Sequence, residues 1–307
     1  MTTPVIVTVT CNPALDVTYD VDALRPGEVH RVRAVHERPG GKGVNVARVL
    51  TRLGVPALAT GLDDGSFGAL VADSGVPAAF VPALGRVRRT LVISAGATTS
   101  LWEPGPPVAA GAADALVEHV AGLLGGAGAL VVSGSLPRGL DADLPARLAD
   151  VAQHAGVPAV LDLDEAPLAR ALVSGGAVLT PNVDELHRLL GRPAADLPAA
   201  ARSLAARNHA PVVLTLGPRG VLASDGDHWW HAATEPVSGN PTGAGDSVTA
   251  ALARGLAAGT PWRRLVADAA CLGAAAVVTP VAGEIDLPTY ERLLASVLVT
   301  TDPEEIP

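Results

Sequence analysis

A glycine-rich segment directly ahead of an apolar stretch carries the strongest chemical signal in this sequence. Residues 240–247 read Asn-Pro-Thr-Gly-Ala-Gly-Asp-Ser, and the stretch that follows predicts a helix. A helix N-terminus presents free backbone N–H groups and the positive end of a dipole, which together favour an anion. Glycines at 243 and 245 let a phosphate approach this backbone, and Asp246 faces the same place. The alternative is that Asp246 only caps the helix or complements its dipole.

A second glycine-rich segment, residues 39–45, reads Pro-Gly-Gly-Lys-Gly-Val-Asn and leads into a helix predicted over residues 44–53. It matches neither the Walker A pattern nor G-x-G-x-x-G, so its spacing alone favours an ordinary turn. Its lysine is unusual, because Lys42 is the only lysine among 22 basic residues. A compact ammonium between two glycines suggests a site where an arginine does not fit.

Two shorter motifs follow predicted strands. Residues 181–185 read Pro-Asn-Val-Asp-Glu, which places Asn182 and Glu185 three apart on one face of the helix that they open. Their oxygens suit Mg²⁺, directly or through water, although a capping box explains the same pair. Asp16 closes the segment 12–16 after the first strand, where α/β proteins hold ligand hydroxyls, or where a turn favours an aspartate.

Three other patterns carry little signal. His228 and His231 flank two tryptophans, but on a strand they point to opposite faces, which disfavours a metal site. Asp162 and Asp164 lie at a strand end, where they are as typical of a turn as of a functional site. A G-x-S-x-G segment is absent, so serine hydrolase chemistry lacks its nucleophile.

Composition narrows the class of protein. Of the 307 residues, 49% are hydrophobic and 17% charged, which excludes a disordered chain. A net charge of −9 leaves no basic footprint for nucleic acid, and glycines and a proline interrupt the longest uncharged run, which excludes a membrane span there. Two cysteines cannot form a disulfide framework. We expect a cytoplasmic protein that binds neither nucleic acid nor membrane.

The elements that must position these residues follow from hydrophobic periodicity. Apolar strand-like runs alternate with helical runs, which predicts parallel βαβ units in a doubly wound sheet. The expected strands cover residues 5–10, 129–133, 159–163, 177–180 and 212–216, with an antiparallel pair at 220–224 and 228–232. The expected helices, after that at 44–53, cover residues 112–124, 144–154, 166–173, 184–190, 198–208, 244–258, 262–278 and 288–298.

Half-exposed strands do not match that buried pattern. Val alternates with His and Arg over residues 29–35, and residues 89–93 and 99–103 predict a hairpin. We therefore expect a small second sheet beside the α/β body. The interpretation is one domain over residues 1–307 with a lid formed by segments at about 17–35 and 88–103, which closes over a ligand.

Taken together, these segments resemble the PfkB, or ribokinase-like, carbohydrate kinases. Residues 240–247 are similar to the C-terminal signature of that family and residues 39–48 to its N-terminal signature, in the family's order. Its internal motifs are similar to residues 132–137, 181–185 and 214–220. The resemblance runs nearly end to end and implies a ribokinase-like, mostly parallel sheet flanked by helices. It also implies ATP and Mg²⁺ as ligands, and a homodimer in which two lids pack together.

The resemblance also implies a role for each candidate residue. Asp246 would be the general base, and the backbone N–H groups of Gly243, Ala244 and Gly245 would hold the transferred phosphoryl group. Asn182 and Glu185 would position Mg²⁺ through water. The remaining ligand contacts would be Asp16, Gly41 and Asn45 for sugar hydroxyls, Lys42 and Arg88 for a substrate phosphate, and Asn182, Thr215, Gly217 and Gly220 for the nucleotide.

Motifs typical of one branch of the family narrow the range of substrates that the resemblance implies. Segment 12–16, the Gly-Lys-Gly at 41–43, Arg88 and the Glu-Pro-Gly-Pro at 103–106 resemble the branch that acts on phosphorylated ketohexoses. The expected reaction converts fructose 1-phosphate to fructose 1,6-bisphosphate. The alternatives are 6-phosphofructokinase, tagatose-6-phosphate kinase and, from another class, a non-catalytic sugar-phosphate-binding protein. Thr180 stands where that branch commonly has lysine.

Overall fold

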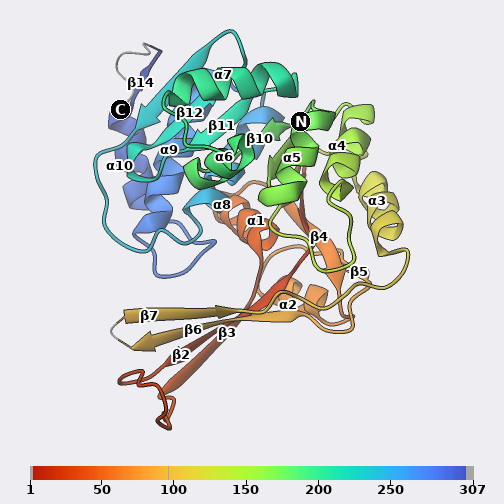
Figure 1. The fold of residues 1–307 in the computed structure, drawn as a ribbon, viewed down its shortest axis with the longest axis vertical. Coiled ribbons are helices and arrows are strands. Elements are labelled where there is room, and N and C mark those ends of the chain that lie inside the picture. Colours follow the sequence, from red (N-terminus) through yellow and green to blue (C-terminus); the bar gives the residue numbers. More distant parts are fainter. Residues whose placement is uncertain (1–2, 96, 302–307) are drawn as a thin grey trace.

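A large sheet forms the centre of the computed structural model, which describes residues 3–95 and 97–301 (Figure 1). Its strands follow the order β14-β13-β12-β11-β10-β9-β8-β1-β4-β5. The pairs from β5 to β11 are parallel, and β11 to β14 are antiparallel, so the predicted mostly parallel sheet is confirmed. The strands are β1 Ile6–Thr10, β4 Ala57–Asp63, β5 Val81–Pro82, β8 Ala129–Ser133, β9 Ala159–Asp162, β10 Val178–Leu179, β11 Val212–Thr215, β12 Val221–Ser224, β13 Trp229–Ala233 and β14 Leu298–Thr300.

Helices cover both faces of this sheet, and the sheet separates the apolar core into two clusters. Leu130 and Val132 of β8 pack into one apolar cluster, while Ala129 and Val131 pack into the other. Because both faces are buried, the strands are continuous apolar runs in the sequence. The helices are α1 Lys42–Arg52, α2 Phe67–Asp73, α3 Ala112–Leu123, α4 Leu144–His154, α5 Glu165–Ser174, α6 Val183–Leu190, α7 Leu197–Asn208, α8 Ala244–Ala257, α9 Trp262–Val277 and α10 Leu287–Ser296.

A separate four-stranded sheet projects from this body below α1 and α2 (Figure 1). Its order is β3-β2-β6-β7, with β2 at Ala14–Asp20, β3 at Ala34–Gly40, β6 at Arg88–Ala95 and β7 at Ala97–Trp102. The predicted hairpin is therefore present as β6 and β7. That this sheet works as a lid stays a prediction.

The strand expected over residues 29–35 is wrong. The chain there is mostly irregular, and β3 begins at Ala34, which pairs with Asp20 at the end of β2. Earlier residues have no strand in register beside them, and Val29 is 96% exposed. An alternating pattern forms a strand only where a neighbouring strand pairs with it through hydrogen bonds. The segment at 17–35, which was predicted to form part of a lid, is therefore a hairpin with a long irregular tip.

Further elements depart from the sequence analysis. β4 and α2 were not predicted, and the helix expected to reach residue 298 ends at Ser296, because Val297 is extended and the chain enters β14. Gly61 in β4 adopts φ +145°, and a Cβ there would clash with the carbonyl of Thr10 on β1, so the close contact between these two strands requires glycine at this position.

Over the described residues, every helix is too short or too polar to cross a membrane.

Candidate active site

A cavity of about 1090 Å³ lies at the carboxyl ends of the central strands, between the small sheet and the first turns of α1 and α8. This is the edge at which open α/β sheets bind ligands. Most of the predicted residues line it: Asp16, Gly41, Lys42, Asn45, Arg88, Asn182, Glu185, Thr215, Gly243, Gly245 and Asp246. Ala244, Gly217 and Gly220 are outside this lining, although Ala244 is the first residue of α8.

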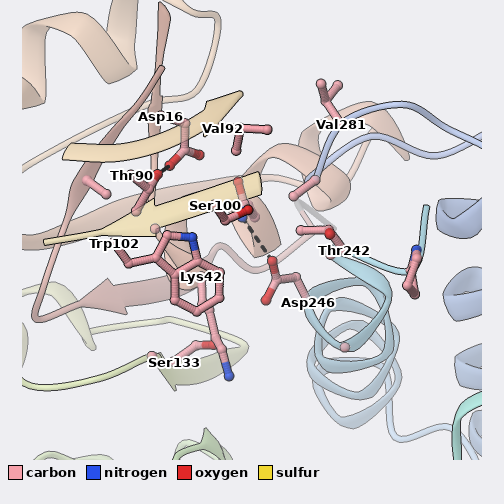
Figure 2. A pocket seen from close by; sticks show the side chains of 18 of the residues that line it. Asp16, Lys42, Thr90, Val92, Ser100, Trp102, Ser133, Thr242, Asp246 and Val281 are labelled. Atoms are coloured by element: carbon pink, nitrogen blue, oxygen red, sulfur yellow. Dashed lines mark hydrogen bonds between the residues drawn. The ribbon is translucent and has the colours of Figure 1, made fainter. Parts of the chain in front are cut away.

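Asp246 is a buried carboxylate in the lining of the cavity. It lies on the first turn of α8, and its Oδ2 accepts a hydrogen bond from Asn45 Nδ2 at 2.9 Å, the dashed line that ends at Asp246 in Figure 2. Burial, reinforced by the charge of Asp162, raises the pKa of Asp246 to about 7, against the opposing effects of Lys42 and the Asn45 bond. A carboxylate with this pKa is suited to accept a proton near neutral pH.

The loop before α8 forms a cradle of backbone groups. Gly243 adopts a left-handed φ of +87°, and a Cβ there would lie 2.7 Å from the Cα of Ala282, so the position requires glycine. Within the described residues, a Cβ at Gly245 would meet no atom within 4 Å. The Ala244 N–H donates to the carbonyl oxygen of Pro241 at 3.2 Å, so the backbone of Gly243 and Gly245 is the more accessible part of this helix N-terminus. A helix N-terminus of this kind suits a phosphoryl group.

Lys42 is part of a second charged cluster that sequence reasoning missed. Its Nζ lies 3.2 Å from Asp162 Oδ1, while Ser133 Oγ donates to Asp162 Oδ2 at 2.8 Å. Figure 2 shows Lys42 extended toward Ser133. Asp162 raises the pKa of Lys42 more than burial lowers it, and Asp246 and Glu185 raise it further, so the ammonium stays charged.

The sequence left Asp162 open between a turn residue and a functional residue, and the structure places it in the lining of the cavity. It is the last residue of β9 and is 6% exposed, with both carboxylate oxygens in contact with the cavity lining. The usable signal was its place at the carboxyl end of a central strand, where ligand contacts gather. Ser133 ends the neighbouring strand β8 and carried the same signal.

Asp16 and Arg88 lie on the small sheet, one on each of two paired strands. Asp16 accepts a short hydrogen bond from Thr90 Oγ1, and burial raises the pKa of its carboxyl. The Arg88 guanidinium donates to the carbonyl oxygens of Glu103 at 3.0 Å and Asn12 at 3.4 Å. Both acceptors are neutral. Burial lowers the pKa of Arg88, and the nearby charges of Asp16 and Glu103 oppose this effect.

The pair at the start of α6 forms the capping box that the sequence allowed. Asn182 Oδ1 accepts from the Glu185 backbone N–H, and Glu185 Oε2 accepts from that of Asn182, each at 2.9 Å. Burial raises the pKa of Glu185, and the charges of Asp162 and Asp164 add to this effect. This excess of negative charge fits a divalent cation held through water.

Direct metal coordination has no support elsewhere in the described chain. Residues 3–95 and 97–301 contain no group of three or more His, Cys, Asp or Glu side chains that could hold a metal ion. His231 Nε2 pairs with the carbonyl of Arg219 at 2.7 Å, and His228 Nδ1 lies 3.3 Å from Asp225. Each of the two histidines thus has a ring nitrogen directed at an oxygen of a different residue.

The side of the cavity that was predicted to bind the nucleotide is built from neighbouring strand ends. Asn182 pairs with Thr215 in a parallel bridge, which brings the α6 motif beside the end of β11. Thr180, which replaces a lysine common in the branch, donates from Oγ1 to the carbonyl of Leu161 at 3.2 Å. Its hydroxyl is therefore satisfied within the sheet.

The fold and the site together define an α/β phosphotransferase, with a glycine-rich helix N-terminus beside a buried carboxylate. The chain belongs to the pfkB family of carbohydrate kinases, whose family model matches residues 7–289.

Solved structures agree with this membership. Phosphofructokinase-2 from Escherichia coli in complex with fructose-6-phosphate is 29% identical, with a TM-score of 0.86 over 95% of this chain and 98% of that one. A possible 1-phosphofructokinase from Thermotoga maritima is 21% identical, with a TM-score of 0.85 over 97% and 99%. Arabidopsis thaliana ribokinase, complexed with ribose and ATP, is 23% identical, with a TM-score of 0.73 over 96% and 99%. The last two similarities establish the fold alone.

Proposed function

We propose that this protein transfers the γ-phosphoryl group of ATP to a hydroxyl of a phosphorylated ketohexose, with fructose 1-phosphate as the preferred acceptor. The observation that carries the proposal is the position of Asp246. Its buried carboxylate is on the first turn of α8, directly beside the glycine cradle at residues 243–245. A proton acceptor and an anion site in contact are what transfer of a phosphoryl group to an alcohol needs.

In this mechanism, Asp246 takes the proton of the attacking hydroxyl as that oxygen attacks the γ-phosphorus in line with the leaving oxygen. The N–H groups of Gly243, Ala244 and Gly245 stabilise the charge on the transferred group. Mg²⁺, held through water near Asn182 and Glu185, would neutralise charge on the nucleotide phosphates. Positioning and electrostatics supply most of the catalysis in such reactions.

The substrate phosphate is assigned to the cationic groups of the cavity. Within the described residues, the Arg88 guanidinium donates to two backbone carbonyls and forms no ion pair, although the charges of Asp16 and Glu103 lie close enough to oppose the lowering of its pKa by burial. Lys42 supplies a second positive charge on the floor of the same cavity. Arginine presents a planar pair of donors that matches a phosphate. Asp16, Gly41 and Asn45 would contact the sugar hydroxyls.

Fructose 6-phosphate is the second candidate acceptor. The supporting observation is the 29% identity to Escherichia coli phosphofructokinase-2, whose structure contains that sugar phosphate. Tagatose 6-phosphate differs from fructose 6-phosphate in the stereochemistry of one hydroxyl, and the same assay tests it as an acceptor. A sugar-phosphate-binding protein without turnover is the alternative from another class.

An assay of ADP release separates these possibilities. Fructose 1-phosphate, fructose 6-phosphate, tagatose 6-phosphate and plain fructose are compared at equal concentration, with ATP and Mg²⁺. The highest kcat/KM is expected with fructose 1-phosphate. No turnover with any of the four contradicts the kinase proposal, and isothermal titration then asks whether the sugar phosphates bind. Highest activity on plain fructose contradicts the roles given to Lys42 and Arg88.

Assembly as a homodimer through the small sheet is a further part of the proposal. Leu101 of β7 is 55% exposed, which is apolar surface that a second small sheet would cover, whereas Trp102 beside it points to the other face of the strand and lines the cavity. Sedimentation velocity on the wild-type chain and on Leu101→Glu tests whether the protein forms this dimer, and we expect the variant to be monomeric.

A cytoplasmic location also remains a proposal. It agrees with two free, buried cysteines.

A further inference from the structure

Arg48 lies three residues after Asn45 on α1, and its guanidinium makes two directed contacts beside the cavity. Nη1 donates to Asn45 Oδ1 at 3.1 Å, and Nη2 donates to the carbonyl oxygen of Pro39 at 2.8 Å. Pro39 lies near the end of β3, so the side chain joins the first turns of α1 to the small sheet. The sequence signature gave Arg48 no role.

The contact with Arg48 determines which way the Asn45 amide faces. Its other end donates from Nδ2 to Asp246 Oδ2 at 2.9 Å. A guanidinium offers donors only, and an ionised carboxylate offers acceptors only. If the amide turned over, its NH₂ would face the guanidinium and its oxygen would face the carboxylate, so both hydrogen bonds would be lost.

The surroundings of Asn45 increase the free-energy cost of the reversed amide orientation. Asn45 is 5% exposed. The backbone of Gly283 covers the pair, since a Cβ there would lie 3.0 Å from Asn45 Oδ1 and 3.1 Å from Arg48 Nη1. Little space is therefore left for water between Gly283 and the Asn45 oxygen, and an unpaired polar group at a buried position costs free energy.

We propose that Arg48 is a positioning residue of the phosphoryl-transfer site, which holds the Asn45 amide so that its N–H meets the carboxylate of Asp246. Arg48 acts through Asn45 and need not touch substrate. The kinetic consequence rests on the proposed function, because it requires Asp246 to be the general base. The orientation of the amide does not depend on that assignment.

The consequence for Asp246 has a definite sign. The Asn45 bond and the charge of Lys42 on α1 lower its pKa, while burial and the charges of Asp162 on β9 and Asp16 on β2 raise it. Loss of the bond must therefore raise the pKa of Asp246 above about 7. Burial lowers the pKa of Arg48 to about 10, helped by Arg38, so Arg48 keeps its charge between pH 6 and 9.

The test compares Arg48→Met with Arg52→Met, a matched control at an exposed position four residues further along α1. In Arg48→Met, the acid limb of the kcat/KM profile is expected to move up by about one pH unit, the size of one hydrogen bond to a charged group. Activity at pH 7 then falls about fivefold and recovers by pH 9. In an Asn45→Ala background, Arg48→Met is expected to cause no further shift.

Two results would overturn the proposal: an unchanged acid limb in folded Arg48→Met, or a full additional shift in the Asn45→Ala background. If Arg48→Met does not fold, Asn45→Ala alone decides, because an unchanged acid limb there shows that the amide bond does not tune Asp246. A ¹³C-carboxyl NMR titration of Asp246, with its signal assigned by Asp246→Asn, reads the same shift without substrate. It separates failure of this inference from failure of the proposed function.

Discussion

Lys42 Nζ lies 3.2 Å from Asp162 Oδ1, although 120 residues separate the two in the chain. The pair joins the first turn of α1 to the end of β9 and is part of the cavity lining. Lys42 is thus held among the carboxylates of Asp162, Asp246 and Glu185, all of which raise its pKa. A single ammonium therefore offsets part of the negative charge on which the site depends.

Asp162→Asn tests that arrangement. Without the charge of Asp162, the pKa of Asp246 falls below about 7, so the acid limb of kcat/KM moves to lower pH. Lys42 also loses the partner that positions it, and kcat is expected to fall roughly ten- to hundredfold. Asp150→Asn, at an exposed position on α4, is the control. An acid limb that stays in place would show that Asp162 does not influence Asp246.

Asp246→Asn is expected to abolish phosphoryl transfer while leaving ATP affinity intact. The amide cannot take the proton of the attacking hydroxyl, and loss of a general base typically costs about 10²–10⁴ in kcat. The new side chain still offers an oxygen to Asn45 Nδ2, so the local structure is preserved. Single-turnover kinetics and calorimetric ATP titration measure the two effects. Retention of the wild-type kcat would remove Asp246 from the role of base.

The same substitution should stabilise the protein in a pH-dependent way. The pKa of Asp246 rises from 3.8 to about 7 on folding, so the native state binds more protons than the unfolded state between these values. Wild-type stability therefore falls as pH rises from about 4 to 7. At pH 8, Asp246→Asn is expected to raise the free energy of unfolding by up to roughly 4 kcal/mol.

Urea unfolding at pH 5 and pH 8 measures that gain. The difference between Asp246→Asn and wild type should be larger at pH 8, where the buried carboxylate is ionised. An equal difference at the two pH values would mean that folding does not shift the ionisation of Asp246. Activity and stability would then have to be explained separately.

Lys42→Arg keeps the charge and changes its shape. The side chain starts between Gly41 and Gly43, and its Nζ lies 3.2 Å from Asp162 Oδ1. A planar, longer guanidinium does not reproduce the position of a compact ammonium against that carboxylate. We expect KM for the sugar phosphate to rise at least about tenfold.

The matched control is Arg52→Lys, the reverse exchange at an exposed position on the same helix. Steady-state kinetics at saturating ATP give KM for each variant. A wild-type KM in Lys42→Arg would mean that the single lysine of this chain is an accident of composition.

Local features of the chain were sufficient to predict much of the fold and part of the site. The apolar runs predicted α4 at Leu144–His154 and β8 at Ala129–Ser133 with their observed bounds. The glycine-rich turn before α8 and the capping box of Asn182 also follow from short segments. Hydrophobic periodicity, caps and glycines act over a few residues, so a sequence reveals them directly.

Tertiary structure alone decided the contacts that tune the chemistry. β3 starts at Ala34 because β2 ends at Asp20, which no periodicity within residues 29–35 could indicate. Asp162 meets Lys42 across 120 residues, and Asn45 meets Asp246 across 201. Such pairs depend on which strand ends and helix termini the sheet order brings together. The pKa of Asp246 depends in addition on how deeply its carboxyl is buried. Neither the pairing nor the burial can be predicted from the spacing of residues along the chain.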